Sequence, residues 1–179
     1  MTNGADVEIE RRFLAREVPS EFTNIEGRIV SDRYIPANAD HCYLRIRRDG
    51  NNFQITKKIL KQDGDLSQMR EYTIPLSIVE YDALICLPSK AAVKRRFDHK
   101  VEGTKLQIGV FEENLLGLII VDAEFETVED SKSFVPPSWF ATEVTGDKRF
   151  AGGELCGKSI DDLADALRQY GIDIGQTSK

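Results

Sequence analysis

The sequence predicts an α+β fold: an antiparallel β-barrel of about eight strands that forms a tunnel with a charged interior, with helices packed on its outside. Three observations predict this fold class. About eight stretches alternate apolar and polar residues with the period of a β-strand. Short turns such as Asp49-Gly50-Asn51 separate several of them, which favours antiparallel neighbours. The polar positions carry long charged side chains whose sign differs from strand to strand.

The strands and helices follow from local patterns along the chain. Ser77 with Glu80 three residues later forms a capping box, which predicts a helix that runs on to Leu87. A short helix over 129–135 stops before two prolines, and a last helix begins at Ser159 and ends at Gly171. The alternating stretches predict strands over 7–15, 28–36, 42–50, 52–59, 69–76, 92–100, 104–113 and 118–128.

Length and composition exclude several classes of protein. The 179 residues suit one domain, which we expect over 1–179 with its core at about 7–170. The net charge of −6 argues against a nucleic-acid binder, which is usually basic. The three cysteines form no CxxC pair, and we find neither a signal peptide nor an apolar run of about 18 residues. These features predict a cytoplasmic protein with neither a membrane nor a nucleic-acid partner.

The charged sides of the strands favour the barrel over an open sheet. In one strand alone, charges that alternate with apolar residues usually mark a solvated face. Here the signs are segregated, because acids dominate the first and last strands and bases the middle ones. The acids of these faces are Glu8, Glu10, Glu71, Glu124 and Glu126, and the bases are Arg12, Arg45, Arg47, Lys58, Lys94 and Arg96.

A barrel that encloses these faces needs a ligand of matching chemistry. Confined charges are costly to desolvate unless they are paired or occupied. Arg and Lys bind phosphate oxygens, whereas clustered carboxylates coordinate Mg²⁺ or Mn²⁺. We therefore expect a chain of phosphates that binds together with a divalent metal ion.

The ordered set of motifs resembles the CYTH superfamily, the triphosphate tunnel metalloenzymes, and most closely its single-domain bacterial members. The ExExK signature appears as Glu8-Ile9-Glu10-Arg11-Arg12. The later motifs are LRIR, TKK, REY, KRRF and DAEFE, and the segment 136–150 contributes Glu143, Lys148 and Arg149. The resemblance spans about residues 7–156.

The resemblance implies a role for each charged residue. Inorganic triphosphate or another triphosphorylated small molecule would be the partner, with Mg²⁺ or Mn²⁺ as the cofactor, and a homodimer is an option. The implied metal ligands are Glu8, Glu10, Glu124 and Glu126. The implied substrate-binding residues are Arg12, Arg45, Arg47, Lys58, Lys94, Arg96 and Arg149. The implied catalytic residues are Glu71, Arg12 and Lys94.

Departures from the family pattern leave alternatives open. Where relatives have E-x-D-x-F, this chain has Gln107 and Gly109, and a glycine offers no side chain to a metal ion. Met69 and Thr73 replace an Arg and a Glu. A metal-dependent triphosphatase of reduced activity and a non-catalytic triphosphate-binding module both fit this pattern. A class IV adenylyl cyclase fits less well, because we identify no residues that would recognise adenine.

Overall fold

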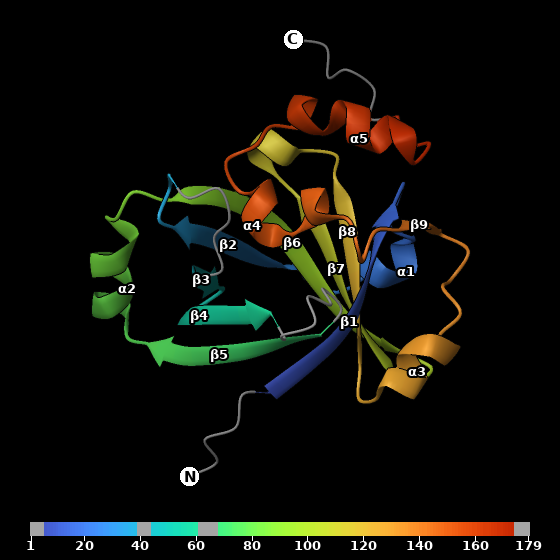
Figure 1. The fold of residues 1–179 in the computed structure, drawn as a ribbon, viewed down its shortest axis with the longest axis horizontal. Coiled ribbons are helices and arrows are strands. Elements are labelled where there is room, and N and C mark those ends of the chain that lie inside the picture. Colours follow the sequence, from blue (N-terminus) through green and yellow to red (C-terminus); the bar gives the residue numbers. More distant parts are fainter. Residues whose placement is uncertain (1–5, 39–43, 61–67, 174–179) are drawn as a thin grey trace.

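In the computed structural model the described residues are 6–38, 44–60 and 68–173. They form a strongly bent antiparallel sheet with helices around it, which confirms the α+β class (Figure 1). All eight predicted strands are present within a few residues of their expected ends, except that residues 42 and 43 of the third lie outside the described residues. They are β1 (Asp6–Ala15), β2 (Arg28–Ile35), β3 (Leu44–Asp49), β4 (Asn52–Leu60), β5 (Gln68–Leu76), β6 (Lys90–Val101), β7 (Thr104–Phe111) and β8 (Ile119–Phe125).

A ninth strand, β9 (Phe140–Glu143), was not predicted, so the expected number of eight is wrong for the sheet of the described residues. β9 pairs with the C-terminal half of β1, where Phe13 faces Glu143 and the register shifts between Leu14 and Ala15. Four residues are too few for an alternating pattern to stand out in a sequence.

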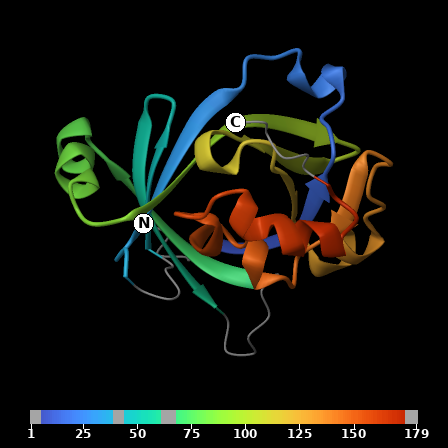
Figure 2. The same ribbon diagram turned by 90° about the horizontal axis from the view of Figure 1, so that it is seen from above.

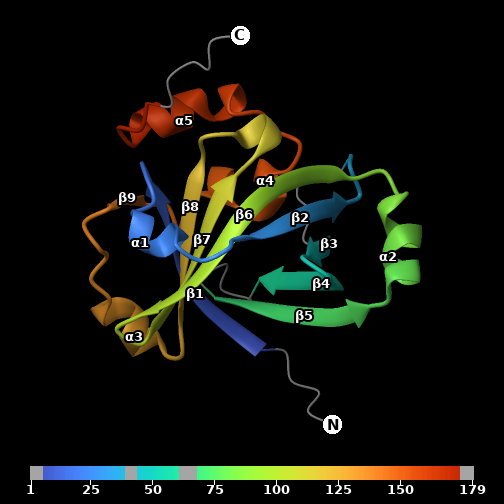
Figure 3. The same cartoon turned by 180° about the vertical axis from the view of Figure 1, so that it is seen from behind.

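The order of the strands is β5-β4-β3-β2-β6-β7-β8-β1-β9. β1 pairs with β8 through residues 9–14, and its N-terminal residues 6–9 pair with β5, the strand at the other end of this order. Views from opposite sides show β5 and β1 meeting at the bottom of the molecule (Figures 1 and 3). β1 is therefore the element that connects the two ends of the sheet.

The helices largely agree with the sequence. α2 (Ile78–Ile85) begins with the predicted capping box, since the backbone N–H of Ser77 donates to Glu80 at 2.7 Å and that of Glu80 donates to the Ser77 hydroxyl at 3.3 Å. α3 (Val128–Ser133) lies where the second helix was expected. The last predicted helix is divided into a 3₁₀ turn, η3 (Asp161–Leu163), and α5 (Ala164–Gln169).

The remaining helical segments of the described residues are short: α1 (Ser20–Thr23), η1 (Glu113–Leu115), η2 (Lys148–Phe150) and α4 (Gly152–Leu155). Gly171 follows α5 with a φ of 66°, a left-handed conformation that suits glycine and ends the helix as predicted. Among the described residues, none of the helices is long and apolar enough to span a membrane.

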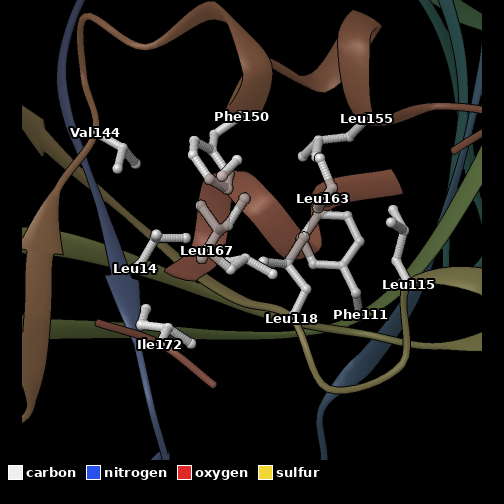
Figure 4. Close-up of a cluster of buried hydrophobic side chains, with 12 residues drawn as sticks. Leu14, Phe111, Leu115, Leu118, Val144, Phe150, Leu155, Leu163, Leu167 and Ile172 are labelled. Carbon is white, nitrogen blue, oxygen red and sulfur yellow. The ribbon is translucent and has the colours of Figure 1, made fainter. Parts of the chain in front are cut away.

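Apolar clusters cover both faces of the sheet. Phe13, Val121 and Ile108 are buried on the outer face, where Phe22 of α1 packs against the same cluster. A second cluster joins Leu14, Phe111 and Ile120 of the strands to four side chains of the C-terminal segments: Phe150, Leu155, Leu163 and Leu167 (Figure 4). Each fully buried side chain of this size contributes about 1.5–3 kcal/mol to folding.

The second cluster corrects the expectation that the helices pack only on the outside. Leu14 lies on the same face of β1 as Glu10 and Arg12, because side chains two residues apart point the same way. α4 and α5 therefore cover one end of the charged face rather than the apolar outer face. Seen from above, these segments, drawn in orange and red, lie over one end of the curved sheet (Figure 2).

Candidate functional site

The charged face of the sheet is buried rather than solvated. Arg45, Arg47, Asp32 and Asp122 are each only 8% exposed, although they come from three different strands. Side chains on a solvated face would be far more exposed. We call this side of strands β1 to β8 the inner face; it carries these four residues and the other charged side chains that share their side of the strands.

Arg47 and Asp32 form a buried ion pair with two hydrogen bonds on the inner face. Asp32 lies opposite Arg47 in the register of β2 and β3, and its two oxygens accept from Nε and Nη2 of Arg47 at 2.6 and 2.7 Å. Burial by itself would raise the pKa of Asp32, but Arg47 and Arg45 outweigh it and hold the pKa well below its usual range. Both charges therefore persist at neutral pH despite their burial.

Arg45 is held far more loosely. Its Nε lies 3.8 Å from Oδ1 of Asp32, and its Nη2 lies 3.8 Å from Oε1 of Glu71. The Nη2 donates a long hydrogen bond of 3.5 Å to the Thr56 hydroxyl. Its Nε is buried and has no hydrogen-bond partner in the described part of the chain. A buried donor left in this way costs about 1–3 kcal/mol, so Arg45 keeps a donor that an acceptor from outside the described residues would satisfy.

Glu71 connects two strands of bases. It faces Lys58 in the register of β4 and β5, and its Oε2 lies 3.1 Å from the ammonium of Lys58. The hydroxyl of Thr73 donates to its other oxygen at 2.9 Å. Burial would raise the pKa of Glu71, but Lys58 and Arg45 outweigh this effect and lower the pKa from 4.5 to about 2.

Lys94 is the least compensated of the predicted bases. Within the described residues no carboxylate lies within 4 Å of its ammonium, which instead sits 5.5 Å from the ring centre of Phe111. Burial lowers its pKa from 10.5 to about 8. The side chain lies against Gly109, where a Cβ would come within 3.0 Å of its Cδ. The missing side chain at 109 therefore gives Lys94 its space.

Arg12 is anchored at the end of the inner face that the C-terminal segments cover. Its Nε donates to Asp122 at 2.6 Å, its Nη2 to Glu10 at 3.2 Å, and its Nη1 to the carbonyl of Phe150 at 3.2 Å. Burial opposes the charge, but Asp122 and Glu10 outweigh burial and raise the pKa of Arg12 above its usual value. Arg12 thus links β1, β8 and η2.

Two of the predicted metal ligands face each other. Glu10 lies opposite Glu124 in the register of β1 and β8. Like charges directly opposite each other destabilise a sheet unless a cation lies between them. Glu124 also contacts Gln107, and it accepts from Lys105 at 2.6 Å.

The other predicted ligands are placed less favourably. Glu126 is exposed in a bend beyond the end of β8. Glu8 belongs to β1, but its side chain is outside the part of the chain that the structure describes. Among the described residues, no three His, Cys, Asp or Glu side chains are grouped in a way that could hold a metal ion.

Two predicted substrate-binding residues are occupied by neighbouring acids. Nε of Arg96 donates to Asp98 at 2.8 Å, and Arg28 donates to the other oxygen of that carboxylate at 2.6 Å. Arg149 is half-exposed on η2, where Asp147 accepts from its Nε at 2.9 Å. Arg149 is therefore bound to the C-terminal segments, while Arg96 belongs to the inner face.

The sequence argument missed Asp32 and Asp122, the two buried aspartates of the site. Asp122 lies two residues before Glu124 and shares its face, so the alternation contained the signal. Asp32 stands between Ser31 and Arg33 in a strand that resembles a solvated one. Only the pairing of β2 with β3 reveals its partner.

Comparison with known proteins agrees with this architecture. No model of a protein family matches the chain. The chain is 31% identical over 150 residues to the inorganic triphosphatase of Nitrosomonas europaea, which covers 83% of this chain and 95% of that protein. A solved structure of an inorganic triphosphatase superposes with a TM-score of 0.61 at 28% identity, over 84% of this chain and 95% of that one.

The fold also recurs in a more distant protein. A proposed adenylate cyclase of Bacillus halodurans superposes with a TM-score of 0.53 over 97% of this chain and 95% of that one, at 15% identity. The bent antiparallel sheet, its charged inner face and the 31% identical relative together define the class of protein. The chain belongs to the CYTH superfamily.

Proposed function

We propose that this protein is a metal-dependent hydrolase of inorganic triphosphate or of a related triphosphorylated compound, bound on the inner face. The observation that carries the proposal is Arg45, a buried guanidinium whose Nε lacks a partner among the described residues. A phosphate oxygen is the acceptor that such a guanidinium binds best. The name of the Nitrosomonas europaea relative, inorganic triphosphatase, supports this substrate class.

In this proposal the sheet closes into a tunnel of eight strands around the ligand. The pairing of β1 with both β8 and β5 supports closure, because it joins the two ends of the order from β5 to β8. Electrostatics supports it as well. Lys58 of β4 helps to lower the pKa of Asp122 of β8, although several strands separate the two in the sheet.

The bases would divide the work along the phosphate chain. Arg45 and Lys94 contact the phosphate oxygens, since neither has a short ion pair to break in the described structure. Arg12 neutralises the charge that develops on the leaving group, a contribution that grows in the transition state. Glu71 positions Lys58 and Arg45 through its two oxygens rather than reacting itself.

Two of the described carboxylates lie where a hard divalent cation would bind, although they do not by themselves make a complete site. Glu10 and Glu124 face each other across β1 and β8, and carboxylate oxygens are the donors that Mg²⁺ and Mn²⁺ prefer. Glu8, which the family resemblance implies as a metal ligand, would be the third donor. A bound ion would polarise the phosphate oxygens and supply a water of lowered pKa.

A second candidate function rests on β7. Gly109 and Gln107 leave the middle of this strand without a carboxylate on the inner face, so only the Glu10–Glu124 end offers paired acids among the described residues. A protein with a phosphate-binding face and one weak cation site would bind triphosphates without turnover.

Phosphate release separates the two candidates. The purified protein would be incubated with tripolyphosphate, ATP and thiamine triphosphate, each with Mg²⁺, with Mn²⁺ and with EDTA. The hydrolase releases phosphate only with a metal ion, and fastest from its own substrate. Metal-dependent thermal stabilisation by tripolyphosphate without any release of phosphate would overturn the hydrolase and leave the binding module.

A further inference from the structure

Asp32 places a negative charge among the bases that are proposed to bind phosphate. Asp32 is 8% exposed and lies on the inner face of β2, opposite Arg47 of β3 and 3.8 Å from the Nε of Arg45. Lys94 of β6 also contributes to the electrostatic environment of this carboxylate. Two of the proposed phosphate-binding bases therefore lie beside one buried acid, and a third acts on it electrostatically.

The geometry of the pair resembles an arginine that already holds its ligand. Nε and Nη2 of Arg47 donate to the two oxygens of Asp32 at 2.6 and 2.7 Å. Two parallel N–H···O bonds are the arrangement in which a guanidinium also binds two oxygens of a phosphate. A phosphate group and Asp32 would thus use the same two donors of Arg47.

Arg45 differs from Arg47 in its contact with Asp32. Arg45 lies on the same strand, two residues away, and its Nε comes no closer than 3.8 Å to Asp32. One carboxylate satisfies Arg47 and leaves Arg45 with an unpaired donor among the described residues. A phosphate that binds Arg47 must therefore compete with the two bonds to Asp32, whereas the Nε of Arg45 has no such bond to lose in the part of the chain that the structure describes.

We infer that Asp32 is a specificity-determining residue that competes with the phosphate chain for Arg47 and thereby makes tight binding depend on a divalent cation. A metal-free polyphosphate brings its full negative charge next to a buried carboxylate, and like charges so placed repel strongly. A cation on the phosphate chain lowers this repulsion. The inference rests on the proposed function, since it concerns the same ligand on the same face.

The test compares Asp32→Asn with the unaltered protein by calorimetric titration of tripolyphosphate, once with EDTA and once with excess Mg²⁺. The asparagine keeps the size of the side chain and removes its charge. We expect the metal-free dissociation constant to fall about 10- to 100-fold, and the constant with Mg²⁺ to change less than about threefold. Asp165→Asn, which removes a charge from a 90% exposed side chain paired with Arg168, is the matched control and should change neither constant more than about twofold.

The ratio of the two dissociation constants separates competition from a structural role. If Asp32 only supported Arg47 structurally, its loss would weaken binding with and without Mg²⁺ alike. Asp32→Thr replaces Asp32→Asn if that variant does not fold, because a threonine hydroxyl still accepts from Arg47 and suits a strand. An unchanged ratio in the variant that folds overturns the inference about Asp32 alone. Failure of the unaltered protein to bind tripolyphosphate under both conditions overturns the proposed function and this inference together.

Discussion

Arg45 and Arg47 are equally buried on the same strand, yet their contacts predict opposite effects when each is replaced by alanine. Arg47→Ala removes both hydrogen bonds from Asp32 and leaves this buried carboxylate, within the described part of the chain, with Arg45 at 3.8 Å as its remaining ion pair. Removing one partner of a buried ion pair costs about 3–5 kcal/mol of the free energy of unfolding.

Arg45→Ala should spare the fold and damage binding. Asp32 keeps its two bonds to Arg47, and Glu71 keeps Lys58 at 3.1 Å, so we expect a loss of stability of about 1 kcal/mol. A hydrogen bond between a charged donor and its ligand is worth about 1.5–3 kcal/mol, which corresponds to about 10- to 150-fold in the affinity for tripolyphosphate.

Urea unfolding measures the first quantity, and calorimetric titration with tripolyphosphate and Mg²⁺ measures the second. Arg168→Ala removes an exposed arginine on α5 and should alter neither beyond about 0.5 kcal/mol. Equal losses of stability in Arg45→Ala and Arg47→Ala would contradict these roles. So would an Arg45→Ala variant that binds tripolyphosphate as tightly as the unaltered protein.

Three further predictions concern the metal site, the stability at acid pH and the C-terminal segments. Gly109→Asp should tighten the binding of Mn²⁺, measured by titration, because it adds a carboxylate to the inner face. The new side chain fits, since the Lys94 side chain that lies 3.0 Å from the new Cβ is flexible and can move aside. An Mn²⁺ affinity no higher than that of Gly109→Asn would contradict this prediction. The stability contributed by Glu71 is fully present above pH 4.5 and is lost as the pH falls towards 2. Between these pH values the free energy of unfolding of Glu71→Gln should therefore fall by on the order of 2 kcal/mol less than that of the unaltered protein. An equally steep decrease in both proteins would contradict the ion pair. Phe150→Ala should lower the free energy of unfolding in urea by about 3–5 kcal/mol, because Phe150 of η2 is fully buried against the strands and the C-terminal helices. A loss below about 1 kcal/mol would mean that the C-terminal segments do not stabilise the fold.

The strands could be predicted because each needs one face against an apolar layer, and this need leaves a two-residue period in the sequence. The capping box of Ser77 and Glu80 was equally clear, since both halves of the motif are local. β9 escaped because four residues carry too little pattern. The end of β8 could not be predicted either, because it depends on pairing with β1 and β7. This pairing stops at Phe125 and leaves Glu126 outside the strand.

The residues of the charged face could be predicted from the sequence, but their ion-pair partners could not. Arg45, Arg47 and Lys94 were identified from alternation and motif, and they do lie on one buried face. Asp32 was missed because its importance comes from Arg47 on another strand, and register across strands is not written in either strand alone. The position of α5 was misjudged for a related reason: an apolar stripe predicts burial, but it does not tell which face of a sheet the helix covers.

We propose that the inner face binds a phosphate chain beside a cation held by Glu10 and Glu124. Diffraction from crystals grown with tripolyphosphate and Mn²⁺, with anomalous data to locate the metal ion, tests it most directly. The account predicts phosphate density within hydrogen-bonding distance of Arg45 and Lys94, and an anomalous peak between the two glutamates. Phosphate bound on the outer surface, with the inner face unchanged and free of manganese, would contradict it.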